Sequence, residues 1–189
     1  VVNGTWSDNT TTKDVYVTLL DAAGKWSEDG TGTLTAPTDM KAATGYNSGS
    51  WDTEVPTTVN KDTEPDTYTY TFTKNTYTVS ITNGEGGSSN PTGDKSVEHG
   101  SDLTITITPD TGYCIEKITL DNVEQDIPAD KKLELKNITD NHTVSITYAI
   151  DSNGDDVPDK YQKKITFIVV NGTWSDNTTT KDVYVTLLD

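Results

Sequence analysis

The sequence VVNGTWSDNTTTKDVYVTLLD, residues 1–21, returns letter for letter as residues 169–189, so the chain repeats with a period of 168 residues. Biased composition does not explain 21 identical positions that include the polar run SDNTTT, and we infer a recent tandem duplication. Repeats are read first because each one is a structural unit. We expect one whole repeat and the opening of the next, as in an array of nearly identical units.

The repeated stretch itself carries a hairpin pattern. Lys164–Val170 reads as a strand, the polar run after it as a turn, and residues 14–20 and 182–188 as the returning strand. The first copy begins in the middle of this first strand. Because an isolated two-stranded hairpin is marginally stable, we expect the second copy to pack on the second module or, by exchange, on the strand-deprived first module of another molecule.

Elsewhere apolar residues alternate with threonine, which is typical of half-buried strands. Examples are residues 67–73, which place Tyr68, Tyr70 and Phe72 on one face, and Leu103–Pro109. The glycine-rich run at 83–93 is expected to be a hairpin loop. With 31% hydrophobic residues any core must be thin, which favours small modules over one large domain. The predicted fold class is therefore mainly β, with tandem small β-rich modules in an elongated array.

The charge balance restricts the partners of the chain. Lys and Arg together number 14 against 30 Asp and Glu, which gives a net charge of −16 and a pI near 4.3. Nucleic acid and anionic lipid both require a basic face, so neither is an expected partner. The longest apolar runs are far shorter than the 18 residues that suggest a membrane span, so no membrane insertion is expected in this segment.

Two groups of motifs resemble known families. The strand VNGTW, the turn GYNSGSWD at 45–52 and the closing strand YTYTF at 68–72 resemble the internalin B-repeat, or Listeria–Bacteroides repeat. The ordered series GEGG (84–87), VEHG (97–100), LTITITPDTGY (103–113), ITLDN (118–122) and NHTVSITY (141–148) resembles the divergent internalin B-repeat domain. These resemblances imply β-grasp-like modules of secreted Gram-positive proteins held at the cell wall.

The resulting domain prediction has four parts. Residues 1–74 form an internalin B-repeat-like module with a truncated first strand, and residues 75–150 form a divergent internalin B-repeat-like module. Residues 151–163 form an acidic linker, and residues 164–189 start the next identical repeat.

The residues that usually carry catalysis are sparse. His99 and His142 are the only histidines and have no second His or Cys at short spacing, as a zinc site or a nucleophilic triad would need. Cys114 lies in an expected strand, where it should be buried and inert. We therefore predict that the chain is not an enzyme.

The linker holds the sharpest chemical motif. Side-chain oxygens of Asp151, Asn153, Asp155 and Asp159, with the carbonyl of Val157, have the 1, 3, 5, 7, 9 spacing of a calcium loop. The segment resembles the loops of EF-hands, dockerins and thrombospondin type 3 repeats, and a structural Ca²⁺ is the expected cofactor. It departs from them at position 6, which is Asp156 instead of Gly, and at position 12, which is Gln162 instead of Glu. The alternative is a solvated acidic linker without metal.

The predicted function is a non-catalytic repeat unit of a bacterial cell-surface protein that acts as a stalk, spacer or adhesin array, with neighbouring repeats as its partners. The alternative is a module that binds a host surface protein or glycan, such as immunoglobulin or mucin, with repetition supplying avidity. Exposed Trp6, Trp26 or Tyr46 would favour binding, and buried rings would favour the stalk.

Overall fold

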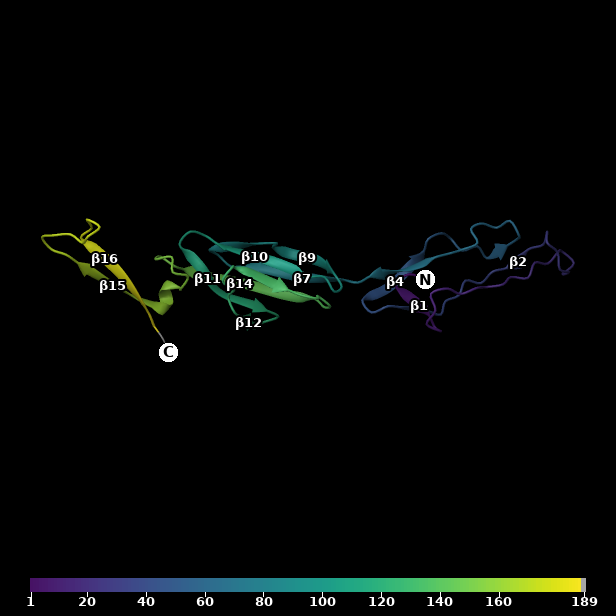
Figure 1. Ribbon diagram of the computed structural model, residues 1–189, viewed down its shortest axis with the longest axis horizontal. Helices are drawn as coiled ribbons and strands as arrows, with labels where there is room; N and C mark the ends of the chain where they lie inside the picture. The colour runs from purple at the N-terminus through teal and green to yellow at the C-terminus, as the bar shows by residue number, and fades with distance from the viewer. Residues whose placement is uncertain (188–189) are drawn as a thin grey trace. The chain divides into compact units, whose positions relative to one another are not determined.

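The computed structural model describes residues 1–187, and these confirm the mainly β prediction (Figure 1). Within that range the only helical element is a 3-10 turn, η1 (Asp159–Tyr161). The chain divides into two compact units, Val1–Thr76 and Tyr77–Asp189. The predicted β-grasp-like arrangement stays a prediction.

The first unit is built from three two-stranded sheets with little core. β1 (Gly4–Trp6) pairs with β3 (Met40–Ala42), β2 (Gly32–Thr33) with β5 (Thr58–Val59), and β4 (Tyr46–Trp51) with β6 (Tyr70–Lys74), all antiparallel. The fully buried apolar side chains of this unit are Trp6 and Phe72. A row of edge-to-face aromatic contacts joins Trp51 to Tyr70 and Tyr70 to Phe72, with ring centroids 5.3 and 5.1 Å apart. The thin core expected from composition is thus present, although the closing strand begins at Tyr70 and not at residue 67.

The second unit has two sheets. One has five strands in the order β12-β11-β14-β7-β9, and the other has three in the order β13-β10-β8. β14 lies beside β7 in parallel, whereas its other neighbour, β11, is antiparallel to it. The strands are β7 (Thr76–Asn83), β8 (Gly87–Asn90), β9 (Gly93–Glu98), β10 (Leu103–Pro109), β11 (Tyr113–Leu120), β12 (Val123–Gln125), β13 (Lys132–Leu135) and β14 (His142–Ile150).

The core of this unit follows from the period of two along its strands. On β7, Val79 and Ile81 are buried while the residues between and beside them turn outward, and Ile105 and Ile107 on β10 do the same. Thirteen buried side chains form one apolar cluster drawn from both sheets. Its members are Val79, Ile81, Val97, Ile105, Ile107, Ile115, Ile118, Leu133, Leu135, Ile138, Val144, Ile146 and Tyr148.

One part of this unit differs from expectation, because β8 occupies the centre of the segment 83–93 that was predicted to be a hairpin loop. Its residues pair with the second half of β10, and Ser89 is buried. The Ser89 hydroxyl accepts a hydrogen bond from Asn83 Nδ2 and donates one to the Pro91 carbonyl. A Cβ on Gly87 would overlap the ring of Tyr148, so glycine here allows a strand to lie against an aromatic ring.

The two identical copies fold differently. In the second copy β15 (Gln162–Ile168) and β16 (Thr180–Thr186) form the predicted antiparallel hairpin. In the first copy the predicted strand at 14–20 is wrong, because residues 12–19 have no strand pairing and only Leu20 makes isolated bridges, to Trp26 and Thr31. The cause is the partner, since β16 pairs with residues that precede the repeated stretch.

The hairpin does not pack on the core of the second unit, which corrects one of the two packing alternatives. Its apolar side chains Ile165, Phe167, Val183 and Val185 are 42 to 49% exposed. A single chain does not test the other alternative, exchange with another molecule.

Candidate functional site

The predicted calcium loop leaves the end of β14 and is anchored by Asp151. This residue is only 4% exposed, and its backbone N–H donates to the Gly112 carbonyl at 2.9 Å. Its carboxylate accepts three backbone hydrogen bonds, from Gly154 at 2.7 Å, Asp155 at 3.3 Å and Asp156 at 2.9 Å. Asp151 therefore closes the loop on itself as the first residue of a cation loop does.

The other predicted ligands lie near the surface and are hydrogen-bonded to neighbours in the loop. Asp155 Oδ2 accepts from Asn153 Nδ2 at 2.9 Å and from Gln162 Nε2 at 2.6 Å. The hydrogen bond from Gln162 is the main reason that the pKa of Asp155 lies below its usual value. Asp159 accepts from the N–H and the hydroxyl of Ser152 at 3.0 and 2.5 Å. Positions 1, 3, 5 and 12 of the loop are thus joined in one network.

The loop is also attached to the body of the second unit. Lys131 makes an ion pair with Asp156 at 2.8 Å, and Lys160 Nζ contacts the carboxylate of Glu116 on β11. Over residues 1–187, however, no three His, Cys, Asp or Glu side chains are grouped closely enough to hold a metal ion. Coordination would require the Asp155 and Asp159 carboxylates to leave their present donors, and calcium binding by Asp151, Asn153, Asp155, Val157 and Asp159 stays a prediction.

Cys114 lies on β11 close to this acidic loop. Its side chain is 1% exposed, as expected. Burial, reinforced by the charges of Asp151 and its acidic neighbours in the loop, raises the pKa of the thiol to about 11. The thiol is therefore protonated at neutral pH and is a poor nucleophile.

The two histidines make separate contacts. His99 Nδ1 lies 3.2 Å from the hydroxyl of Tyr77, and His142 Nδ1 lies 2.7 Å from Asp121 Oδ2. The hydrogen bond to His142 lowers the pKa of Asp121. Among the described residues no serine, threonine or cysteine side chain is hydrogen-bonded to His142, so the Asp121–His142 pair has the base and its orienting carboxylate but no nucleophile.

The aromatic residues that distinguish a stalk from a binding module give a divided result. Trp6 is 4% exposed and belongs to the core of the first unit, and Tyr46 is half-buried. Trp26, in the turn after Leu20, is 88% exposed. One of the three rings is therefore available to a partner.

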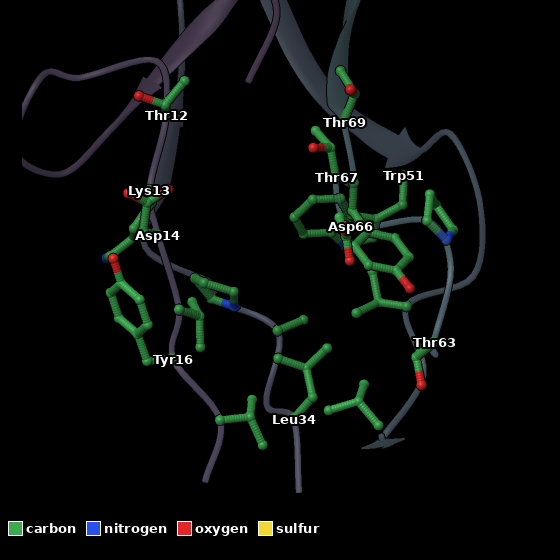
Figure 2. A pocket seen from close by; sticks show the side chains of 18 of the residues that line it. Thr12, Lys13, Asp14, Tyr16, Leu34, Trp51, Thr63, Asp66, Thr67 and Thr69 are labelled. Atoms are coloured by element: carbon green, nitrogen blue, oxygen red, sulfur yellow. The ribbon is translucent and has the colours of Figure 1, made fainter. Parts of the chain in front are cut away.

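The largest cavity of the described chain, about 850 Å³, is a groove in the first unit that the sequence does not reveal. Figure 2 shows its two walls, with Thr12, Lys13, Asp14 and Tyr16 on one side and Asp66, Thr67 and Thr69 on the other. Val15, Val17, Leu34, Trp51, Val59 and Tyr68 also line it. We call this cavity the unit-1 groove. Sequence reasoning placed a paired strand along one wall and so predicted no opening.

Comparison with known proteins gives one match. Residues 77–152 match the family model described as the divergent InlB B-repeat domain, which confirms the resemblance drawn from the motifs between 84 and 148. Searches of curated proteins and of solved structures found no match. The matched segment covers both sheets of the second unit and ends at the start of the acidic loop. Repeat domains of this family are typical of bacterial surface proteins and suggest a non-enzymatic module.

Proposed function

Since residues 77–152 are a divergent InlB B-repeat domain, we propose that the chain is a non-catalytic spacer in a secreted, wall-attached bacterial surface protein, where repeated units set the distance between the cell and an outer domain. The letter-for-letter duplication at a period of 168 residues is the observation that carries this proposal. Identical units add length in equal steps, whereas a catalytic site gains nothing from such repetition.

The charge and the small cores support the same role. A net charge of −16 keeps neighbouring chains soluble and apart. The apolar side chains that are buried lie within single units. In arrays of this kind stability is the sum of the units and their nearest-neighbour contacts.

Small-angle X-ray scattering tests the spacer role. Proteins with one, two and four tandem copies of the 168-residue period should increase in maximum dimension by a constant increment per copy. A compact assembly would instead grow roughly as the 0.38 power of chain length. That weaker growth would contradict a spacer.

Calcium at the acidic loop is a second element of the proposal, with Asp151, Asn153, Asp155, Val157 and Asp159 as ligands. A cation would neutralise the carboxylates and stiffen the segment before β15. Thermal unfolding with and without millimolar Ca²⁺ should show stabilisation of the wild type, by about 2.7 kcal/mol at a hundredfold excess over Kd. Asp155→Ala should lose this gain. The matched control Asp156→Ala, at the position outside the ligand set, should keep it, and equal responses of the two variants would refute the assignment.

The alternative role, an adhesin that binds a host protein or glycan such as immunoglobulin or mucin, is favoured by one observation, the 88% exposed side chain of Trp26. Biolayer interferometry against immobilised mucin and immunoglobulin distinguishes the two roles. Saturable binding that Trp26→Ala removes, and that Trp174→Ala leaves intact, would assign the binding role. For a spacer we expect no saturable signal.

A further inference from the structure

The unit-1 groove is best understood by comparing the two copies of the repeated stretch. Their first twelve residues have the same local structure. The amino group of Val1 donates to the Thr11 carbonyl at 2.7 Å, and the N–H of Val169 donates to the Thr179 carbonyl at 2.9 Å. Trp6 and Trp174 each donate a 2.8 Å backbone hydrogen bond to the residue four positions on. The start of the hairpin therefore has the same register in both copies.

Beyond this point the copies diverge. In the second copy Thr180–Thr186 is paired along its full length with Gln162–Ile168. In the first copy the identical residues 12–18 form one wall of the groove, and within the described chain residues 13–18 make no backbone–backbone hydrogen bond. A strand edge with unpaired N–H and C=O groups is a template for pairing with another strand.

The opposite wall has the register of a second neighbour. Val2 forms a parallel bridge with Thr71, through hydrogen bonds from Val2 N–H to the Tyr70 carbonyl and from Phe72 N–H to the Val2 carbonyl. A strand that leads toward Val1 in the same direction would continue this parallel pairing beside residues 67–70. It would pair at the same time with residues 12–18 in the antiparallel sense, as in the second copy.

The side chains of the groove match those of β15. In the hairpin Ile165 lies opposite Val183, and the carboxylate of Asp182 accepts from Lys164 at 2.7 Å and from Thr166 at 2.6 Å. The same groups stand in the groove wall as Val15, which is 47% exposed, and Asp14. Across the groove, the buried hydroxyl of Tyr68 has no hydrogen-bond partner among the described residues.

We propose that the unit-1 groove binds the β15 strand, Gln162–Ile168, of a second copy of the chain, so that chains join head to tail by strand exchange. On β15 itself, Ile165 and Phe167 are 42 and 49% exposed, and in the hairpin the strand uses only one of its two edges. In the groove it keeps the same antiparallel partner sequence and gains a parallel one. Exchange of identical elements has a low cost, and a head-to-tail contact that does not close produces an open chain.

Complementation between two variants tests this inference. Val15→Glu places a carboxylate in the groove and blocks the acceptor. Ile165→Glu combined with Phe167→Glu blocks the donor and leaves the groove intact. Val183→Glu is the matched control, because it makes the same change in the identical sequence of the hairpin strand that stays behind. Each protein is refolded from urea, so that slow exchange does not limit assembly, and its mass is measured by light scattering.

We expect the wild type and Val183→Glu to form species whose mass rises with concentration. Both blocked proteins should remain monomers, and their equimolar mixture should stop at two chains, because only one functional donor meets one functional groove. A monomeric wild type, or a mixture that forms no dimer, would overturn the inference. Equal assembly of Val15→Glu and Val183→Glu would overturn it as well, because it would show unspecific contact between exposed apolar residues. None of these results depends on the spacer test, which measures the length of covalent arrays.

Discussion

Removal of the Asp151 carboxylate tests whether the acidic loop is a built structure or a solvated linker. The carboxylate is 4% exposed and accepts hydrogen bonds of 2.7, 2.9 and 3.3 Å from consecutive backbone N–H groups. Hydrogen bonds to charged groups each contribute about 1.5–3 kcal/mol. The longest bond adds little, and burial of the charge offsets part of the gain. We therefore expect Asp151→Ala to lower the free energy of unfolding of the second unit by about 2–4 kcal/mol.

Amide hydrogen exchange measures this effect within the second unit, because exchange at a core residue reports the opening of its surroundings. Protection should fall at the buried core residue Ile146 and, more strongly, at the donors Gly154 and Asp156. Asp151→Asn keeps one acceptor oxygen and should lose about half as much free energy, and Asp130→Ala, which removes an exposed carboxylate with a single 3.2 Å backbone bond, should lose below about 0.5 kcal/mol. Equal effects of Asp151→Ala and Asp130→Ala would refute the reasoning.

Three further predictions concern other parts of the chain. Ile146→Ala, at a fully buried position on β14, should cost about 2–5 kcal/mol in urea unfolding of the second unit. Cys114, with its pKa raised to about 11, should resist alkylation at pH 8 in the native chain and react once urea unfolds it. Hydrogen bonds from Lys13 and Ser7 lower the pKa of Asp39 from 3.8 to about 2, so its contribution to stability is complete above pH 3.8 and disappears as the pH falls toward 2. Titration by NMR of Lys13→Ala should move this pKa back toward 3.8.

Most strands of the second unit could be predicted because their apolar residues alternate with polar ones. Val79 and Ile81, and likewise Val144 and Ile146, identify the buried face without knowledge of the partner strand. The turn at Asp121 and Asn122, expected between two strands, has positive φ at both residues, as a tight hairpin requires. A strand whose burial follows its own alternation can be recognised from sequence alone.

β8 could not be predicted on this basis. Its residues GSSN are small and polar, and glycine and serine favour turns in any local reading. The strand forms because Gly87 lets the backbone approach the ring of Tyr148, whose hydroxyl donates to the Ser88 carbonyl at 3.0 Å. Both contacts join residues about 60 positions apart, and no pattern within 83–93 reports them.

The candidate sites divide in the same way. The spacing of Asp151, Asn153, Asp155 and Asp159 correctly located a structured acidic loop, because side chains close in sequence bond to nearby backbone groups. The unit-1 groove escaped sequence reading because it is the space beside a strand that lacks its partner. High strand propensity in KDVYVT predicts pairing but does not supply the residues to pair with.

The duplicated stretch separates these two kinds of information within one molecule. Residues 1–12 and 169–180 share their hydrogen bonds, and Lys13 and Lys181 lie over the rings of Trp6 and Trp174 at 5.2 and 5.5 Å. This loop is determined by its own sequence. The next residues, equally identical, are a strand in one copy and unpaired in the other, so their conformation is determined by whether a segment such as Gln162–Ile168 lies beside them. The stability of such a unit therefore depends on a neighbouring strand, and this dependence couples successive units whether the strand comes from the same chain or from another.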